Sequence, residues 1–176
     1  MALFYITGPT ASGKTTVGEA LRAKGYEVHD SDDEGMRYWA DKQTLQPVDP
    51  PVMNAIEDPQ WHENHIFALA GKPIRELREQ SKHKTIFLVG VTANDLDYKD
   101  LFDKILLLSV GEELQAERIR NRTNHNYGKQ PHQLAAALKW REPQIAKYRE
   151  AGAHEINAAL PIDQVADEII ALTTGA

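Results

Sequence analysis

Short apolar runs alternate along the chain with longer stretches in which apolar residues recur every three or four positions. Apolar runs with the length of a buried strand lie at Leu3–Ile6, Thr85–Val89 and Ile105–Val110, and two shorter segments of mixed polarity, Tyr26–His29 and His154–Ile156, are also expected to be strands. Strands that alternate with helices are typical of a parallel sheet covered on both faces. The pattern therefore predicts an α/β fold.

The periodic stretches between these runs predict the helices. The predicted helices are Thr16 to Gly25, a segment from near Asp32 that carries Met36, Tyr38 and Trp39, Trp61–Gln80 with a break at Gly71 and Pro73, Glu112–Arg122, Pro131–Trp140 with a restart at Pro143, and Asp163–Leu172. Two segments lack periodicity. Residues 43–60 are rich in proline, and residues 121–129 are polar and rich in turn formers, so both are interpreted as long loops.

Length and charge narrow the classes of protein that fit. The chain has 176 residues, which suits one domain, and it has no cysteine, which excludes a disulfide framework and a thiolate zinc site. A formal charge of −6 with dispersed basic residues argues against a nucleic-acid partner. The apolar runs are too short to cross a membrane, and residues 1–7 do not resemble a signal peptide. We therefore expect a cytoplasmic protein, a monomer or dimer, that binds no nucleic acid and no membrane.

The most specific motif directly follows the first apolar run. Residues Gly8–Thr15 read Gly-Pro-Thr-Ala-Ser-Gly-Lys-Thr and fit the G-x-x-x-x-G-K-[ST] pattern of a phosphate-binding loop. Glycines at the two ends let successive backbone N–H groups point at phosphate oxygens, and the following helix adds its dipole. We expect the nucleotide site to be formed by Gly8, Pro9, Thr10, Ala11, Ser12, Gly13, Lys14, Thr15 and Thr16. Lys14 is expected to contact the β- and γ-phosphates, and Thr15 the magnesium ion. The alternative is a glycine-rich turn without a ligand.

The order of these parts resembles the small-molecule kinases of the nucleoside-monophosphate kinase group, and in particular shikimate-kinase-like and gluconate-kinase-like proteins. The resemblance is carried by the phosphate-binding loop, an Asp-x-Asp at residues 30–32, an arginine-bearing helix followed by a polar segment, and a Pro-Ile-Asp helix start at residues 161–163. It implies a three-layer fold with a five-stranded parallel sheet of order 2-3-1-4-5, helices on both faces and a short lid. It also implies a single domain over residues 1–176, a substrate-binding segment at about 32–80 and a lid at about 121–131.

The resemblance further implies roles for charged side chains. It makes Asp30 a ligand of hydrated Mg²⁺, Asp32 the residue that touches the acceptor hydroxyl, and Arg118 and Arg122 the arginines that neutralise the transferred phosphoryl group. The alternatives are a solvated helix cap for the aspartates and a charged surface helix for the arginines. The cofactors implied are ATP and Mg²⁺, and the activity implied is transfer of the γ-phosphoryl group of ATP to a hydroxyl of a small-molecule acceptor.

The acceptor itself is less constrained. The resemblance suggests Asp32, Trp61, Gly90 and Arg141 as substrate-binding residues, with Arg141 as an anionic anchor. However, no arginine occupies residues 61–65, and Gly90 stands alone where shikimate kinases carry three glycines. We therefore expect a nucleoside or another ring-bearing hydroxyl compound, held partly by Trp39 and Trp61, to be a better acceptor than shikimate or gluconate.

Other functions stay open at this point. The chain could be a nucleotide or nucleoside kinase, an ATP-binding switch or ATPase without a small acceptor, or a degenerate kinase that serves as a binding module. The histidines His62 and His65 have no third ligand near them in the sequence and lack the spacing of a zinc-protease helix, so a structural or pocket-lining role is expected for them.

Overall fold

The computed structural model describes the whole chain except residues 34, 50–58, 124–129 and 175–176. Its central sheet contains five parallel strands: β1 (Leu3–Thr7), β2 (Glu27–Asp30), β5 (Ile86–Val89), β6 (Lys104–Ser109) and β7 (His154–Asn157). The strands lie in the order β2-β5-β1-β6-β7. Counted along the chain within this sheet, the order is 2-3-1-4-5, which confirms the topology expected from the sequence. The α/β fold class is confirmed as well.

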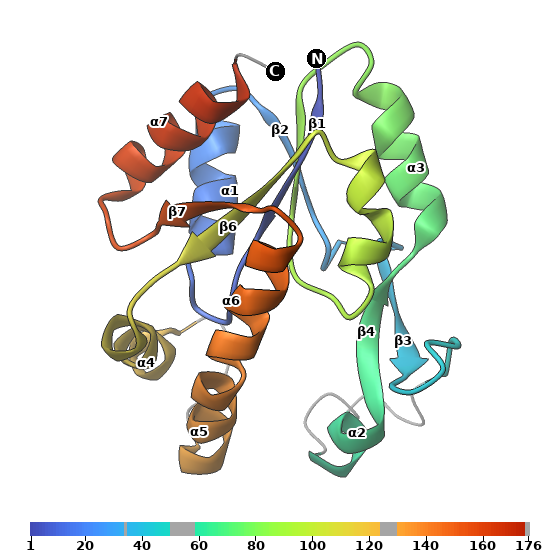
Figure 1. The fold of residues 1–176 in the computed structure, drawn as a ribbon, viewed down its shortest axis with the longest axis vertical. Helices are drawn as coiled ribbons and strands as arrows, with labels where there is room; N and C mark the ends of the chain where they lie inside the picture. The colour runs from blue at the N-terminus through green and yellow to red at the C-terminus, as the bar shows by residue number, and fades with distance from the viewer. Residues whose placement is uncertain (34, 50–58, 124–129, 175–176) are drawn as a thin grey trace.

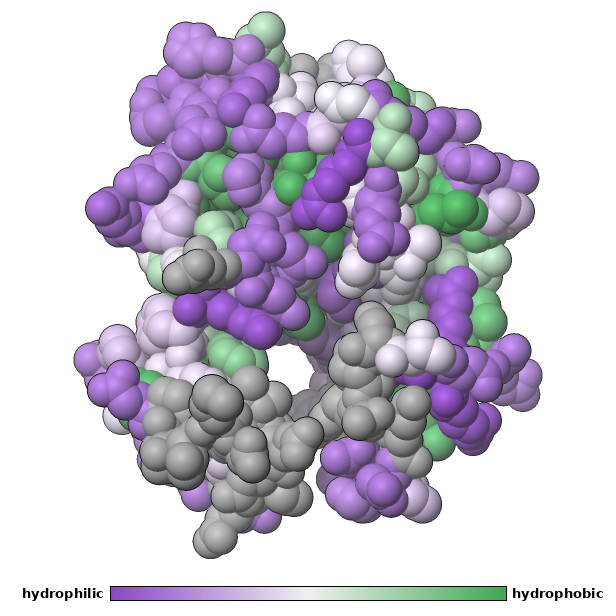
Figure 2. All heavy atoms as spheres, turned by 180° about the vertical axis from the view of Figure 1, so that it is seen from behind, coloured by the Kyte–Doolittle hydropathy of each residue, from purple (hydrophilic) through white to green (hydrophobic). Residues whose placement is uncertain are grey.

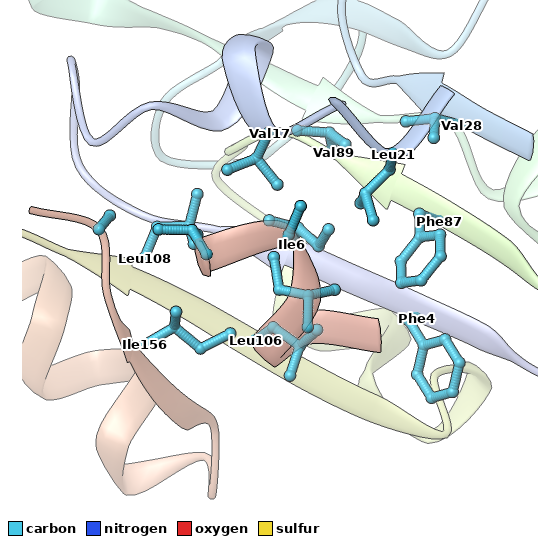
Figure 3. Close-up of a cluster of buried hydrophobic side chains, with 14 of the residues drawn as sticks. Phe4, Ile6, Val17, Leu21, Val28, Phe87, Val89, Leu106, Leu108 and Ile156 are labelled. Carbon is cyan, nitrogen blue, oxygen red and sulfur yellow. The ribbon is translucent and has the colours of Figure 1, made fainter. Parts of the chain in front are cut away.

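Helices cover both faces of this sheet, as Figure 1 shows. On one face, α1 (Lys14–Ala23) and α7 (Ile162–Thr173) pack over an apolar cluster that is drawn in Figure 3. Side chains of β1, β5, β6 and β7 meet Val17 and Leu21 of α1 in that cluster. On the other face lie α3 (Gly71–Gln80), α6 (Arg141–Glu150) and the 3₁₀ helix η2 (Asp95–Leu101), around Tyr5 and Tyr148. These three layers confirm the expected architecture.

The periodic segments after β6 form the expected helices. They are α4 (Glu112–Asn121), α5 (Pro131–Lys139) and α6, with Trp140 between the last two. Pro131 is the first residue of α5, where its missing N–H has no helical partner to lose. The apolar stripe of α3 buries Ile74 and Leu77, and this helix begins at Gly71 as expected, whereas Pro73 lies within its first turn and does not break it.

The structure corrects the prediction for residues 32–69. The segment with Met36, Tyr38 and Trp39 is not helical: Arg37–Asp41 forms strand β3. Only Pro59–Asn64 is helical before Gly71 (α2), and His65–Leu69 forms strand β4, antiparallel to β3. Trp39 lies directly opposite Phe67, with ring centroids 3.9 Å apart. The pairing of aromatic side chains across the two strands favours a sheet, and helical spacing alone does not reveal it.

The β3–β4 sheet is attached to the central sheet through the segment that follows β5. The Asn94 side chain accepts a hydrogen bond from the Leu69 N–H (2.7 Å) and donates one to the Leu69 carbonyl (3.2 Å). The Ala93 N–H also donates to the Phe67 carbonyl (2.9 Å). In Figure 1 the small sheet and α2 extend on one side of the carboxyl ends of the central strands, and α4 and α5 extend on the other. The space-filling view in Figure 2 shows the molecule hollowed between these two parts.

Two expectations fall largely outside the described residues. The proline-rich segment 43–60 includes residues 50–58, and the expected lid at 121–131 includes residues 124–129. Within the part of the chain that the structure describes, no helix is both long and apolar enough to span a bilayer. The face shown in Figure 2 is mostly hydrophilic, with small, scattered apolar patches.

Candidate functional site

The phosphate-binding loop, Gly8–Thr15, connects β1 to α1 at the carboxyl edge of the central sheet. Two of its glycines are required by the backbone. Gly8 has φ +153°, and a Cβ atom there would lie 2.4 Å from the Leu108 carbonyl oxygen of β6. Gly13 has φ +104°, in the left-handed region that side chains disfavour. The spacing of the motif is thus explained by close packing on β6 and by a turn into the helix.

The helix that follows presents unbonded N–H groups to this loop. The first helical hydrogen bond joins the Val17 N–H to the Gly13 carbonyl (2.9 Å). The N–H groups of Lys14, Thr15 and Thr16 precede that bond, and no side chain caps α1. Together with the helix dipole, these donors form a site for an anion.

The ammonium group of Lys14 lies inside the loop and bonds to two of its carbonyl oxygens. Its Nζ atom donates hydrogen bonds to the carbonyl oxygens of Gly8 (2.6 Å) and Pro9 (2.9 Å). An ammonium group has three donors, so one is left for a phosphate oxygen. Burial lowers the pKa of Lys14 to about 8, a change that the charge of Arg122 supports and the charges of Asp30 and Asp32 oppose.

We predict that ATP binding takes up a proton above pH 8. The Lys14 pKa of about 8 is below the ordinary lysine value of 10.5, so between these pH values the native state holds fewer protons than the unfolded state. The contribution of Lys14 therefore makes the free energy of unfolding rise with pH between about 8 and 10.5. Phosphate charge favours the ammonium form, and binding should return the proton. Calorimetric titration with ATP at pH 8.5, in two buffers of different ionisation enthalpy, measures the uptake. Lys14→Met is the control that should lose it, and equal values for both proteins would contradict the prediction.

A pocket of about 630 Å³ opens beside the loop. Its floor is residues 10–17, and Asp32 lines one side. Arg118, Asn121 and Arg122 line another side. Ala158, Leu160 and Ile162, which follow β7, add an apolar end. The pocket therefore joins a phosphate-sized cradle, flanked by charged side chains, to an apolar region that suits a nucleotide base.

Helix α4 fixes the walls of this pocket. The Arg118 guanidinium donates to the carbonyl oxygens of Ser12 (3.3 Å) and Ala158 (2.9 Å), so it ties the phosphate-binding loop to the segment after β7. The buried Gln115 side chain donates to the Thr10 carbonyl (2.9 Å). Sequence reasoning did not single out Gln115, although it lies three residues before Arg118 on the same helix face. Arg122 lines the same pocket, so the structure brings both expected arginines to it.

Asp30 and Asp32 lie on either side of Ser31, where the chain leaving β2 crosses close to Gly90 at the end of β5. The Ser31 N–H donates to the Val89 carbonyl (2.8 Å), and the side chain of Ser31 lies against Gly90. The Asp32 N–H donates to the Asp30 carboxylate (2.9 Å). Burial raises the pKa of Asp30. Asp32 lines the pocket directly, whereas Asp30 acts on Lys14 through its charge.

Gly90 sets the position of this crossing, and we predict that Gly90→Ala disturbs it. A Cβ atom on Gly90 would lie 2.0 Å from Ser31 Oγ and 2.4 Å from Ser31 Cβ. Such overpacking costs about 1–3 kcal/mol and should move both aspartates. Gly111→Ala is a matched control because nothing lies within 4 Å of its added Cβ. Urea unfolding measures the cost, and equal stability of the two variants would contradict the role of Gly90.

The structure reveals a basic residue at the site that sequence reasoning missed. Arg37, the first residue of β3, forms an ion pair with Asp32. Its guanidinium carbon lies 3.7 Å from the centre of the Phe67 ring on β4. Only the pairing of β3 with β4 places Phe67 beneath Arg37, so no local signal in the sequence could have identified this contact.

The two remaining expected substrate residues lie elsewhere. Arg141 is not among the residues that line the pocket: its guanidinium donates to the Val110 carbonyl (3.2 and 2.6 Å) and pairs with Glu142. Trp61 stacks on His65 with ring centroids 3.7 Å apart and meets Trp39 edge-on. Trp39 is 8% exposed, and Phe67 lies at its face. Trp39 is therefore a core residue of the β3–β4 sheet.

The side chain of His62 lies outside the described part of the structure, and His65 is the described member of this pair. His65 Nδ1 lies 2.9 Å from the Trp61 carbonyl, and no group of three or more His, Cys, Asp or Glu side chains is placed to hold a metal within the described residues. A structural role for His65 fits this environment.

Comparison with known families shows which family the chain belongs to. Residues 5–143 match the model of a family described as an AAA domain, which spans most of the chain, including the phosphate-binding loop. The chain belongs to this AAA domain family.

Relatives of this AAA domain protein are kinases. It is 25% identical over 156 residues to dephospho-CoA kinase from Streptococcus mutans, covering 76% of this chain and 79% of that protein. Its fold is similar to a gluconokinase from Sinorhizobium meliloti (TM-score 0.56, 20% identity, 97% and 90% of the two chains). It is also similar to shikimate kinase from Bacteroides thetaiotaomicron (TM-score 0.62, 14% identity, 98% of each chain). These comparisons confirm the resemblance to P-loop small-molecule kinases that the sequence indicated.

Proposed function

We propose that this AAA domain protein transfers the γ-phosphoryl group of ATP to a hydroxyl group of a small-molecule acceptor. The observation that carries the proposal is the pocket of about 630 Å³, because it joins the phosphate-binding loop to Asp32 on one side and to Arg118 and Arg122 on another. A nucleotide-binding switch needs only the phosphate-binding loop. An acidic group beside that loop suits a reaction in which a hydroxyl group is the nucleophile.

The nucleotide side of the pocket supplies charge and shape. The N–H groups at the start of α1 and the Lys14 ammonium bind the phosphates, and Arg122 stabilises charge that grows on the transferred group. Arg118 acts as a positioning residue, because its donors hold the carbonyl oxygens of Ser12 and Ala158. The apolar end near Leu160 and Ile162 receives the base.

The residues present fit a magnesium ion. Hydroxyl and carboxylate oxygens are the ligands that Mg²⁺ prefers, and it keeps several ligands from water and phosphate. Thr15 lines the pocket, and the negative charge of Asp30 acts on Lys14, where it partly offsets the lowering of the Lys14 pKa by burial. Thr15 and Asp30 would hold the ion, which when bound neutralises phosphate charge.

Asp32 orients the acceptor. Its exposed carboxylate accepts the hydrogen of the acceptor hydroxyl, while the hydroxyl oxygen bonds to the γ-phosphorus and ADP leaves with the electrons of the broken P–O bond.

An acceptor screen tests the proposal. ADP release is measured with gluconate, shikimate, nucleosides and dephospho-CoA, and mass spectrometry identifies the phosphorylated product. Acceptor-dependent ADP release that is lost in Lys14→Ala supports the proposal. ATP hydrolysis that no acceptor stimulates, with no phosphorylated product, would instead indicate an ATPase or a switch.

The roles of the two aspartates predict a specific kinetic signature. Asp30→Asn and Asp32→Asn should each lower kcat by about 10²-fold or more, with a much smaller change in ATP affinity, because each acts on metal or acceptor in the transition state. Initial rates and equilibrium ATP binding measure the two quantities. Asp97→Asn, at an exposed position on η2, is the matched control. Loss of ATP affinity with unchanged kcat would contradict these roles.

A further inference from the structure

The ion pair between Arg37 and Asp32 places a guanidinium beside the Asp32 wall of the pocket. Asp32 lines the pocket and its side chain is 63% exposed, whereas the Arg37 side chain is 25% exposed. Asp32 therefore lies at the surface of the pocket, and Arg37 lies next to it, outside the residues that line the pocket. The basic groups that line this pocket, Lys14, Arg118 and Arg122, belong to the nucleotide side.

The small sheet fixes the guanidinium. Arg37 pairs with Leu69 in the β3–β4 register, so Phe67 is its diagonal neighbour on the same face of the sheet. Stacking on the Phe67 ring at 3.7 Å covers one face of the guanidinium and leaves its N–H edge for hydrogen bonds. Arg37 is thus held by packing that does not depend on Asp32.

The partner of this arginine is exchangeable. An ion pair with an exposed carboxylate contributes little to stability, because water competes for both groups. A guanidinium binds carboxylate and phosphate oxygens in the same paired geometry. An anionic group on a bound molecule can therefore replace the Asp32 carboxylate on Arg37.

We infer that Arg37 recognises an anionic group of the acceptor, a carboxylate or a phosphate, and that this group displaces Asp32 toward the acceptor hydroxyl. The inference rests on the proposed phosphotransferase function and narrows its acceptor to hydroxyl compounds with an anionic group. It also gives Asp32 two partners in turn: Arg37 before the acceptor binds, and the hydroxyl afterwards. Arg141 is less suited to this role, because its Nε and one terminal N–H group donate to the backbone carbonyl of Val110.

Matched acceptor pairs test the recognition step. The pairs are shikimate and its methyl ester, gluconate and sorbitol, and AMP and adenosine, which also separate a carboxylate from a phosphate. In the pair that the wild-type protein uses, kcat/KM should favour the anionic member by about 10- to 150-fold, the range expected for charged hydrogen bonds. Arg37→Gln should abolish that preference through a higher KM. Arg37→Lys should keep part of it, and Arg75→Gln, at an exposed position on α3, should keep all of it.

A second measurement tests the release of Asp32 without any acceptor. ATP hydrolysis by Arg37→Gln should exceed that of the wild type, because Asp32 can then orient water, and the double variant with Asp32→Asn should lose the increase. Thermal melting checks that each variant is folded. Phosphorylated product with no charge preference, or a preference that survives in Arg37→Gln, overturns the inference and leaves the proposed function intact. Hydrolysis that is unchanged in Arg37→Gln overturns the displacement of Asp32. The absence of any acceptor-dependent product overturns the proposed function and the inference together.

Discussion

Lys14→Ala is expected to lower kcat/KM for phosphoryl transfer by about 10²–10³-fold, the cost of removing one preorganised donor from a developing charge. Lys14 is expected to act on the phosphates, and its Nζ atom sits within the loop against the Gly8 and Pro9 carbonyls. Alanine is a strong helix former and fits the first position of α1, so the fold should persist. Steady-state kinetics measure the loss, and circular dichroism with thermal melting checks the fold.

Lys24→Ala is the matched control for this experiment. Lys24 lies at the opposite end of α1 and pairs with the exposed Asp167 at 2.9 Å, far along the helix from the phosphate-binding loop. It should change turnover little. A Lys14→Ala protein that is folded and keeps the turnover of Lys24→Ala would show that the loop does not take part in catalysis.

Asp95→Ala is expected to destabilise the protein by about 3–5 kcal/mol, the cost of breaking a buried charged network. Asp95 is fully buried in the layer between the sheet and α6. It accepts hydrogen bonds from Tyr5 Oη (2.9 Å), Tyr148 Oη and Lys147 Nζ (3.0 Å). Burial, followed by the charge of Asp95, raises the pKa of both tyrosines, so their hydroxyls stay protonated as donors. Alanine would remove the acceptor of the Tyr148 hydroxyl and leave Tyr5 Oη with only the Gly90 carbonyl (3.1 Å) and Lys147 Nζ with only the more distant Ala93 carbonyl (3.5 Å).

Urea unfolding of Asp95→Ala and Asp97→Ala separates this network from a general effect on η2. Asp97 lies two residues further along the same 3₁₀ helix and is exposed. Its replacement should cost less than about 0.5 kcal/mol, as for surface positions without special contacts. If the two variants unfold at the same urea concentration, the Asp95 network does not stabilise the fold as its geometry indicates.

Features that depend on neighbouring residues could be predicted from the sequence. The phosphate-binding loop is contiguous, and Gly13 is required by the turn within it, although the close contact of Gly8 with Leu108 depends on the distant strand β6. The three inner strands of the central sheet, β1, β5 and β6, are apolar runs because both of their faces are buried, so the runs reveal them directly. The strand order came from the resemblance to small-molecule kinases, since the runs alone do not determine it.

The β3–β4 sheet could not be predicted in this way. Its apolar residues also fit helical spacing, and the strands are short. Trp39 finds Phe67, and Leu69 finds Asn94, only after segments that are distant in the sequence have come together. A choice between helix and strand that depends on such partners is decided by tertiary packing and by backbone hydrogen bonds to other segments.

The sequence by itself determined the chemistry of the phosphate site, because its donors lie within one turn of chain and the first turn of a helix. The tertiary structure decided which charged side chains meet there. Arg37 reaches Asp32, Arg118 holds the Ser12 and Ala158 carbonyls, and Arg141 turns to Val110. The sequence does not indicate which group a long, flexible arginine side chain will contact, because its direction is set by the carbonyl or carboxylate that packing brings within reach.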